Sequence, residues 1–158
     1  MSIASGPGSY VLYLVVEHEI RVRVGRSGIF DFYPGGYFYS GSAQGPGGVK
    51  ARLKHHLRLA VSPRWHLDWL RPYARIVRGY VVLSEERLEC DWSKALARLP
   101  GSGIPAAGFG ASDCWNGCPA HLIYFANRAD QVQIKFILQE IAKQQVQELS
   151  SADLAILD

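Results

Sequence analysis

Glycine and proline, the two residues that most strongly interrupt regular secondary structure, are distributed unevenly along this chain. Ten of the 16 glycines lie before position 49 and none follows Gly117, while the last of the 8 prolines is Pro119. The first third of the chain is therefore expected to contain many turns, and residues 120–158 are free of both breakers. This distribution predicts a turn-rich folded body followed by a helical tail.

The size and composition favour one folded domain. A chain of 158 residues can bury about 68–70% of the surface that its unfolded form exposes, so its core needs no disulfide or metal. The 48% hydrophobic and 20% charged residues are those of a folded soluble protein and exclude intrinsic disorder.

No segment resembles a membrane span or a secretory signal. The longest aliphatic and aromatic run, Tyr10–Val16, is much shorter than the ~18–20 residues that cross a bilayer, so no membrane partner is expected. The start of the chain, Met1–Gly8, lacks the basic and apolar pattern of a signal peptide. Three cysteines, an odd number, form no closed disulfide framework. We therefore expect a reducing, cytoplasmic location.

The hydrophobic pattern predicts alternating strands and helices. Strands are expected over 9–16, 20–24, 75–83 and 121–125, the first two within a meander of short antiparallel strands over 10–41. Helices are expected over 46–60, over 65–70, after a Ser84 cap with Glu85 and Glu86 in the first turn, and over 130–149. Residues 100–120 form an irregular loop too long to be a mere connection, and such loops are usually functional or tied down.

Basic residues are concentrated in the middle of the chain. Residues 49–87 hold nine Lys and Arg against three Asp and Glu, a net of +6, whereas residues 127–158 hold three against five, a net of −2. A basic segment can bind a polyanion or can be a solvated helix face, and charge alone leaves both interpretations open. In the first case, the side chains that would follow a nucleic-acid backbone are Lys50, Lys54, His55, Arg58 and Arg64.

Two tripeptides on the early strands, Gly8-Ser9-Tyr10 and Tyr39-Ser40-Gly41, are followed by Arg52 and His56 on the basic helix and then by Glu89. In this order, these residues resemble the GIY-YIG (Uri) nuclease superfamily. The similarity is closer to a small branch with the motifs YxYxGSAxGPGG, H-x-D and GFGxSDC. Here these motifs are Tyr37–Gly48, His66–Asp68 and Gly108–Cys114, the last followed by Pro-x-His-Leu. The likeness covers about residues 8–125.

The resemblance implies an α/β (α+β) fold, with a small antiparallel β-sheet flanked by helices and an added C-terminal helix. It also implies a nuclease-like domain over 1–126 and a C-terminal helical extension over 127–158. Two departures are visible. Ser9 and Ser40 stand where isoleucine is typical, and 28 residues separate Tyr10 from Tyr39, more than in a typical member of the superfamily.

The resemblance also implies roles for five residues. Tyr10 would act as general base or position the attacking water, and Tyr39 would order the same site. Arg52 would hold the scissile phosphate, and His56, one helical turn later, can reach the same phosphate. Glu89 would bind one divalent cation, Mg²⁺ or Mn²⁺. Taken singly, the tyrosines could equally be core aromatics, and Arg52 and Glu89 could be solvated helix residues.

The function that follows is a metal-dependent endonuclease that hydrolyses nucleic-acid phosphodiester bonds, with DNA expected as the substrate rather than RNA and DNA repair as one setting. A non-catalytic module that binds nucleic-acid structures, or an accessory to a repair enzyme, is the alternative. The C-terminal helix could dock a protein partner or a second copy of the chain.

A second candidate site combines Cys114, Cys118 and His121, spaced Cys-x3-Cys-x2-His in the glycine-rich loop. These three side chains could hold Zn²⁺, with Cys90 completing a tetrahedral set if the fold brings it near. Buried structural thiols beside a hydrogen-bonded histidine are the alternative. His66 and Asp68 could orient one another or a phosphate, but the sequence around them is also typical of an aromatic-anchored core helix.

Overall fold

The computed structural model describes residue 3 and residues 5–157. Residues 1, 2 and 4 of the expected domain over 1–126 and residue 158 of the expected extension over 127–158 lie outside the described residues. Its strands are β1 (Gly8–Val16), β2 (Ile20–Val24), β3 (Gly28–Phe32), β4 (Gly35–Ala43), β5 (Arg75–Leu83), β6 (Ser102–Gly103), β7 (Leu122–Phe125) and β8 (Gln147–Leu149). Its helices are α1 (Gly48–Leu57), α2 (His66–Leu70), the 3-10 helix η1 (Arg71–Tyr73), α3 (Glu89–Ala97), α4 (Gln131–Ala142) and α5 (Ser151–Leu157). The expected α+β fold class, with an antiparallel sheet and flanking helices, is confirmed.

β1 and β4 lie at the centre of a six-stranded sheet of order β6-β7-β4-β1-β5-β8. Neighbouring strands in this sheet are antiparallel. Nearly all of β1 is buried, because its continuous apolar run packs against side chains on both faces. The prediction of a doubly buried strand over 9–16 is therefore confirmed. Across β1 and β4, Tyr10 lies opposite Gly41 and Ser9 opposite Ser42.

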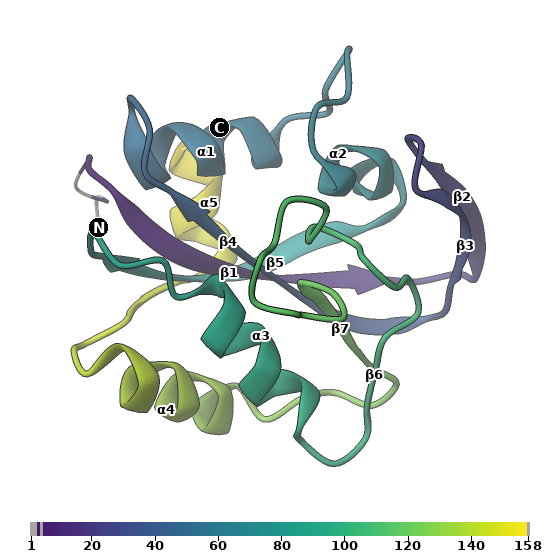
Figure 1. The fold of residues 1–158 in the computed structure, drawn as a ribbon. Helices are drawn as coiled ribbons and strands as arrows, with labels where there is room; N and C mark the ends of the chain where they lie inside the picture. The colour runs from purple at the N-terminus through teal and green to yellow at the C-terminus, as the bar shows by residue number, and fades with distance from the viewer. Residues whose placement is uncertain (1–2, 4, 158) are drawn as a thin grey trace.

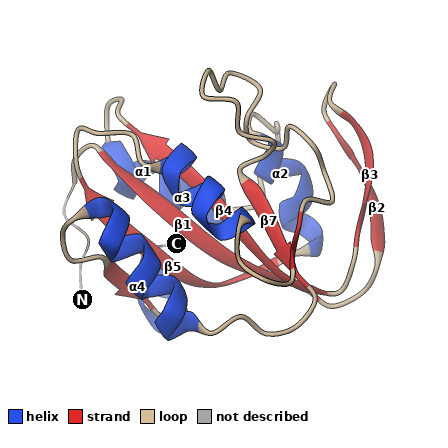
Figure 2. Ribbon diagram, turned by 60° about the horizontal axis from the view of Figure 1, so that its bottom comes forward, coloured by secondary structure: helices blue, strands red, loops and turns tan. Residues whose placement is uncertain are grey.

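β2 and β3 form a separate two-stranded hairpin beside the main sheet (Figure 2). The expected meander over 10–41 is therefore wrong in its pairing, since β1 pairs with β4 and the hairpin is inserted between them. The physical reason lies in the two patterns. β2 alternates buried and exposed residues and has a single apolar face, which lies against α2, whereas β1 is apolar on both faces and requires covered neighbours.

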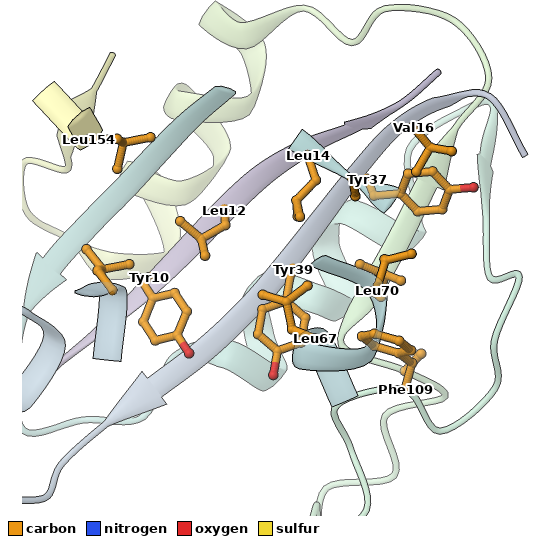
Figure 3. Packing of buried hydrophobic residues seen from close by; sticks show 14 of the residues in the cluster. Tyr10, Leu12, Leu14, Val16, Tyr37, Tyr39, Leu67, Leu70, Phe109 and Leu154 are labelled. Atoms are coloured by element: carbon orange, nitrogen blue, oxygen red, sulfur yellow. The ribbon is translucent and has the colours of Figure 1, made fainter. Parts of the chain in front are cut away.

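Helices cover both faces of the main sheet (Figure 1). Alternate side chains of β1 enter two different cores. Tyr10, Leu12 and Leu14 point into the core under α1, α2 and α5 (Figure 3), and Val11 and Tyr13 enter the core under α3 and α4. The molecule therefore has three layers, with β1 and β4 in the middle layer.

Two helices begin later than expected. α1 starts at Gly48 rather than at position 46, because Gly47 (φ 83°) and Gly48 (φ 59°) are both left-handed and form a turn first. α3 starts at Glu89, so the expected cap by Ser84 is wrong. The Ser84 hydroxyl instead accepts the N–H of Glu86 within a turn.

The single helix expected over 130–149 is also wrong. α4 begins after the Asp130 cap but ends at Ala142, where Lys143 is left-handed (φ 58°). The chain then forms β8, which pairs with β5 at the edge of the main sheet, and α5 follows. Burial of Val146 and Leu149 stabilises this arrangement. Among the described residues, no helix has the length and apolarity needed to cross a membrane.

Candidate active site and metal cluster

The expected catalytic residues lie near the end of β4 that has no hydrogen-bonded partner strand on the β7 side. β4 pairs with β7 only from Gly36 to Tyr39, and one more hydrogen bond joins Ser40 N–H to the His121 carbonyl at 3.0 Å. Past this point, side chains from both faces of the sheet can approach one another. They enclose a cavity of about 320 Å³. Its lining includes Tyr10, Tyr39, Ser42, Arg52, Trp65, Arg87, Glu89, Asp113 and His121.

Tyr10 and His56 form a buried pair below this cavity. The Tyr10 hydroxyl lies 2.8 Å from His56 Nε2, and both residues are 0% exposed. Burial raises the pKa of Tyr10 to about 12, although the Arg52 cation opposes this shift. Burial, together with repulsion from Arg52, lowers the pKa of His56 to about 3. The Tyr10 hydroxyl is therefore protonated near neutral pH, and the imidazole is neutral.

Tyr39 lies beside Tyr10, with ring centroids 6.5 Å apart and both hydroxyl ends on the same side of the sheet (Figure 3). Burial raises the pKa of Tyr39 well above its ordinary value, and the nearby Tyr10 adds to this shift. Glycine is required at position 41 because the Tyr10 ring crosses it. A Cβ at position 41 would lie 2.5 Å from Tyr10 Cζ. The second tripeptide thus provides both a tyrosine and the space for its neighbour.

Arg52 projects from α1 over the Trp65 indole, with its Cζ atom 4.4 Å from the ring centroid. Its Nη1 also lies 3.5 Å from the Ser42 carbonyl, at the limit of a hydrogen bond. Stacking on Trp65 orients the guanidinium toward the cavity while leaving its donors available for an anion.

Glu89 enters the cavity from the first turn of α3. Its side chain is half-buried, and Oε2 accepts a hydrogen bond from the Ser42 hydroxyl. Arg87 and Asp113, both exposed residues, line the same cavity. The site therefore combines a fixed cation, Arg52, with carboxylate oxygens that suit a hard divalent cation.

The five residues expected to contact nucleic acid have different environments. Lys54, Arg58 and Arg64 are exposed, and Lys50 is half-buried. His55 is committed to a hydrogen bond, since its Nε2 lies 2.9 Å from Asp68 Oδ2. The remaining basic side chains lie on α1 and on the segment that follows it.

His66 and Asp68 do not orient one another. Asp68 accepts the N–H groups of Arg64 and Trp65 at 2.7 and 3.0 Å and so caps α2. Burial raises the pKa of Asp68, but these hydrogen bonds and His55 outweigh it and hold the pKa below its usual range. His66 accepts the Gly110 N–H at Nδ1 (2.7 Å), and its Nε2 lies 3.0 Å from the Ser27 hydroxyl. His66 thus joins the hairpin to the long loop.

The second candidate site is assembled as a four-residue cluster. Cys90, on α3, lies against Cys114, Cys118 and His121, and the potential ligand atoms are all within 4.8 Å of one another. Cys90 Sγ is 3.4 Å from Cys114 Sγ and 3.6 Å from His121 Nε2. This cluster could hold a metal ion.

The three thiols of this cluster have different pKa values. Burial and the adjacent thiols raise the pKa of Cys118 to about 12. Burial also acts on Cys114, but the backbone N–H groups of Cys118 and Asn116 outweigh it and lower its pKa to about 6. Cys114 is therefore the readiest of the three to ionise.

Ser42, Arg87 and Asp113 are cavity residues that sequence reasoning missed. Asp113 lies in the GFGxSDC motif, and Arg87 had been counted only as part of the basic segment. Ser42 is the serine of the YxYxGSAxGPGG motif, but its place opposite Ser9 follows only from the strand register.

Residues 9–144 match the family model described as a domain of unknown function, DUF123. The chain belongs to the DUF123 family. No curated protein matches this chain, and no solved structure matches it. The match to DUF123 runs from β1 through α4, so the cavity and the Cys/His cluster both lie within the family domain.

Proposed function

We propose that this DUF123 protein is a metal-dependent endonuclease that hydrolyses phosphodiester bonds in nucleic acid, with DNA as the substrate. The proposal depends on one observation, the convergence of Tyr10, Tyr39, Arg52 and Glu89 on a single cavity from four separate segments. The DUF123 family is generally considered GIY-YIG-like, which agrees with the order of these residues in the sequence.

Arg52 and Glu89 have complementary roles in this proposal. The Arg52 guanidinium binds the scissile phosphate and neutralises the charge that grows in the transition state. Glu89 contributes a carboxylate oxygen to Mg²⁺ or Mn²⁺, and such an ion stabilises the oxygen that leaves phosphorus. The cavity residues fit such an ion because Glu89 and Asp113 both offer oxygen ligands.

Tyr10 positions the attacking water rather than removing its proton. With a pKa of about 12, its hydroxyl is a poor base in the free protein. The Tyr10 hydroxyl is held by its hydrogen bond to His56 Nε2, and in the imidazole tautomer whose Nε2 accepts, a lone pair on the Tyr10 oxygen stays available for a water O–H. The buried Tyr39 fixes the Tyr10 ring from the side.

A nucleic-acid-binding module without cleavage activity is the second candidate function. The complete burial of Tyr10 and its raised pKa favour it, because they make the Tyr10 hydroxyl a poor base. In that case, Arg52 and the exposed side chains of Lys54 and Arg64 would still bind phosphates.

Nicking of supercoiled plasmid with Mg²⁺ or Mn²⁺ tests the enzyme against the module. We expect wild-type cleavage, and a loss of at least about 10²-fold in Glu89→Ala and Arg52→Ala. Glu85→Ala and Arg98→Ala change exposed residues of the same charge and should cleave like the wild type.

The enzyme proposal fails if duplex, single-stranded, branched and RNA substrates all remain intact with either metal. Salt-sensitive binding in that case would favour the module.

We also propose that the Cys/His cluster holds Zn²⁺. Three sulfurs and one imidazole nitrogen are a common structural zinc set, and Zn–S bonds of about 2.3 Å imply sulfur separations of about 3.8 Å in a tetrahedron. The separation between Cys90 and Cys114 is close to this value. Four protein ligands would leave no open position, so the ion would be structural and would fasten the loop to α3 beside Glu89.

A further inference from the structure

Ser9 is a buried serine where the related motif has an apolar residue, and its hydroxyl makes two hydrogen bonds. Ser9 is 0% exposed, its Oγ accepts the N–H of Leu88 at 3.0 Å, and it lies 2.7 Å from the Oγ of Ser42. Ser42 in turn hydrogen-bonds to Glu89 Oε2. The two hydroxyls therefore connect the backbone at Leu88 with the carboxylate of the next residue.

The direction of these hydrogen bonds is fixed by counting protons. Each hydroxyl has one proton, and the Leu88 N–H can only donate. Ser42 donates its one proton to the Glu89 carboxylate, so Ser9 must be the donor to Ser42. The reverse orientation would leave the carboxylate without this donor. Hydrogen bonds in such a chain polarise one another, and the last one is strengthened by the charge on its acceptor.

The chain also fixes the start of α3. Leu88 is the N-cap residue of this helix and makes no side-chain cap hydrogen bond. The Ser9 hydroxyl, from the adjacent β1, binds the Leu88 N–H, which is the donor that an N3 side chain binds in a capping box. The backbone at Leu88 and the side chain of Glu89 are thus both held by one pair of hydroxyls, directly opposite each other on β1 and β4.

Ser40 provides a built-in comparison. It occupies the middle of the second tripeptide as Ser9 occupies the middle of the first, and it is 1% exposed. Among the residues that the structure describes, its Oγ has no hydrogen-bond partner. A buried serine in this motif is therefore not sufficient to build the chain, and the position opposite Ser42 decides the outcome.

We propose that Ser9 and Ser42 are positioning residues that orient the Glu89 carboxylate toward a divalent cation. This role rests on the proposed function of Glu89 as a metal ligand. Groups that support a ligating carboxylate in this way typically change metal affinity by about 10–100-fold when they are removed. Ser9 is the more informative of the two, because it acts on Glu89 only through Ser42 and Leu88.

Titration of the full chain with Mn²⁺, followed by electron paramagnetic resonance, tests the proposal. The Mn²⁺ binding that is lost in Glu89→Gln, seen as a larger signal from free Mn²⁺, defines the Glu89 site. We expect Ser9→Ala to weaken this site by about 10-fold or more. Ser9→Thr, which keeps the hydroxyl on a β-branched side chain suited to a strand, should restore affinity. Ser40→Ala should bind like the wild type, since no hydrogen bond is lost.

The outcomes separate this proposal from the proposed function. If Glu89→Gln loses Mn²⁺ binding at this site but Ser9→Ala keeps full affinity for Mn²⁺, the positioning role of Ser9 is wrong. If Glu89→Gln binds like the wild type, the metal role of Glu89 fails. Hydrogen exchange of the Leu88 amide then remains a test of the chain itself. Exchange should be faster in Ser9→Ala than in Ser40→Ala, and equal rates would overturn it.

Discussion

His56 shows how a single buried residue can set the protonation state of the site. Its ring is surrounded by the rings of Tyr10, Tyr39 and Trp65, with centroids 5.6, 5.7 and 5.7 Å away. Within the described part of the chain, its Nδ1 has no hydrogen-bond partner. Because a charged imidazole would be desolvated here and repelled by Arg52, the neutral form is strongly favoured.

The pKa of His56 predicts a loss of stability in mild acid. An unfolded histidine has a pKa near 6.5, whereas folded His56 takes up a proton only near a pKa of about 3. The unfolded state thus binds more protons between these values, so the free energy of unfolding falls as the pH is lowered through this window, by as much as ~5 kcal/mol in total. Urea unfolding between about pH 7 and about pH 4.5 measures the slope.

The matched variant for this measurement is His56→Gln, which cannot take up a proton. Its stability should fall less steeply over the same pH range than that of the wild type. Burial also lowers the pKa of His66, but this contribution is present in both proteins and cancels in the difference. Parallel pH profiles for the two proteins would contradict the prediction.

At the scale of elements, local patterns predicted those whose partners are close in sequence or whose apolar run is continuous. β5 has the bounds expected from the sequence, and α2 lies within the expected 65–70. The structure of the tail differs from the single helix expected over 130–149, because it depends on pairing with β5, a strand far away in the sequence. Residues 144–149 carry no glycine or proline, and Gln147–Leu149 form β8 only because β5 offers an open edge.

The same distinction applies to the candidate site. The motifs placed Tyr10, Arg52 and Glu89 through their order along the chain, and the fold brings them to one cavity. Ser42 lies inside the YxYxGSAxGPGG motif, but its contacts with Ser9 and Glu89, like the place of Arg87, could not be predicted in this way. Their place depends on the register between β1 and β4 and on the late start of α3, and neither leaves a signal in composition or periodicity.

The Cys/His cluster predicts a metal-dependent connection between α3 and the loop over 104–121. Protein purified without chelators should contain about one Zn²⁺ per chain by elemental analysis. Removing the ion should lower the melting temperature, because ligand binding to the folded state stabilises it. Cys118→Ser should lose most of the zinc. Ser93→Ala, which changes a buried α3 hydroxyl outside the cluster, should retain it. Substoichiometric zinc in the wild type would exclude the site.

Across the whole molecule, basic side chains are concentrated on α1 and on the segment that follows it. The net charge is only +3, yet residues 49–87 carry a large basic excess while residues 127–158 are net acidic. α1, with Lys54 exposed, and α4 lie on opposite sides of the main sheet (Figure 1). Arg52 on α1 also lines the cavity. A polyanion attracted to the α1 face would therefore arrive at the candidate site.

This arrangement predicts that DNA affinity depends on salt through α1 and not through α4. Binding of a short labelled duplex, measured by fluorescence anisotropy in EDTA to prevent cleavage, should weaken linearly as log Kobs against log salt. Lys54→Gln should reduce the steepness by about 0.9, the contribution of one phosphate contact to B-DNA. Lys143→Gln removes an exposed charge at the end of α4, and the slope should stay unchanged. An equal effect of the two substitutions would mean that DNA does not bind by the α1 face.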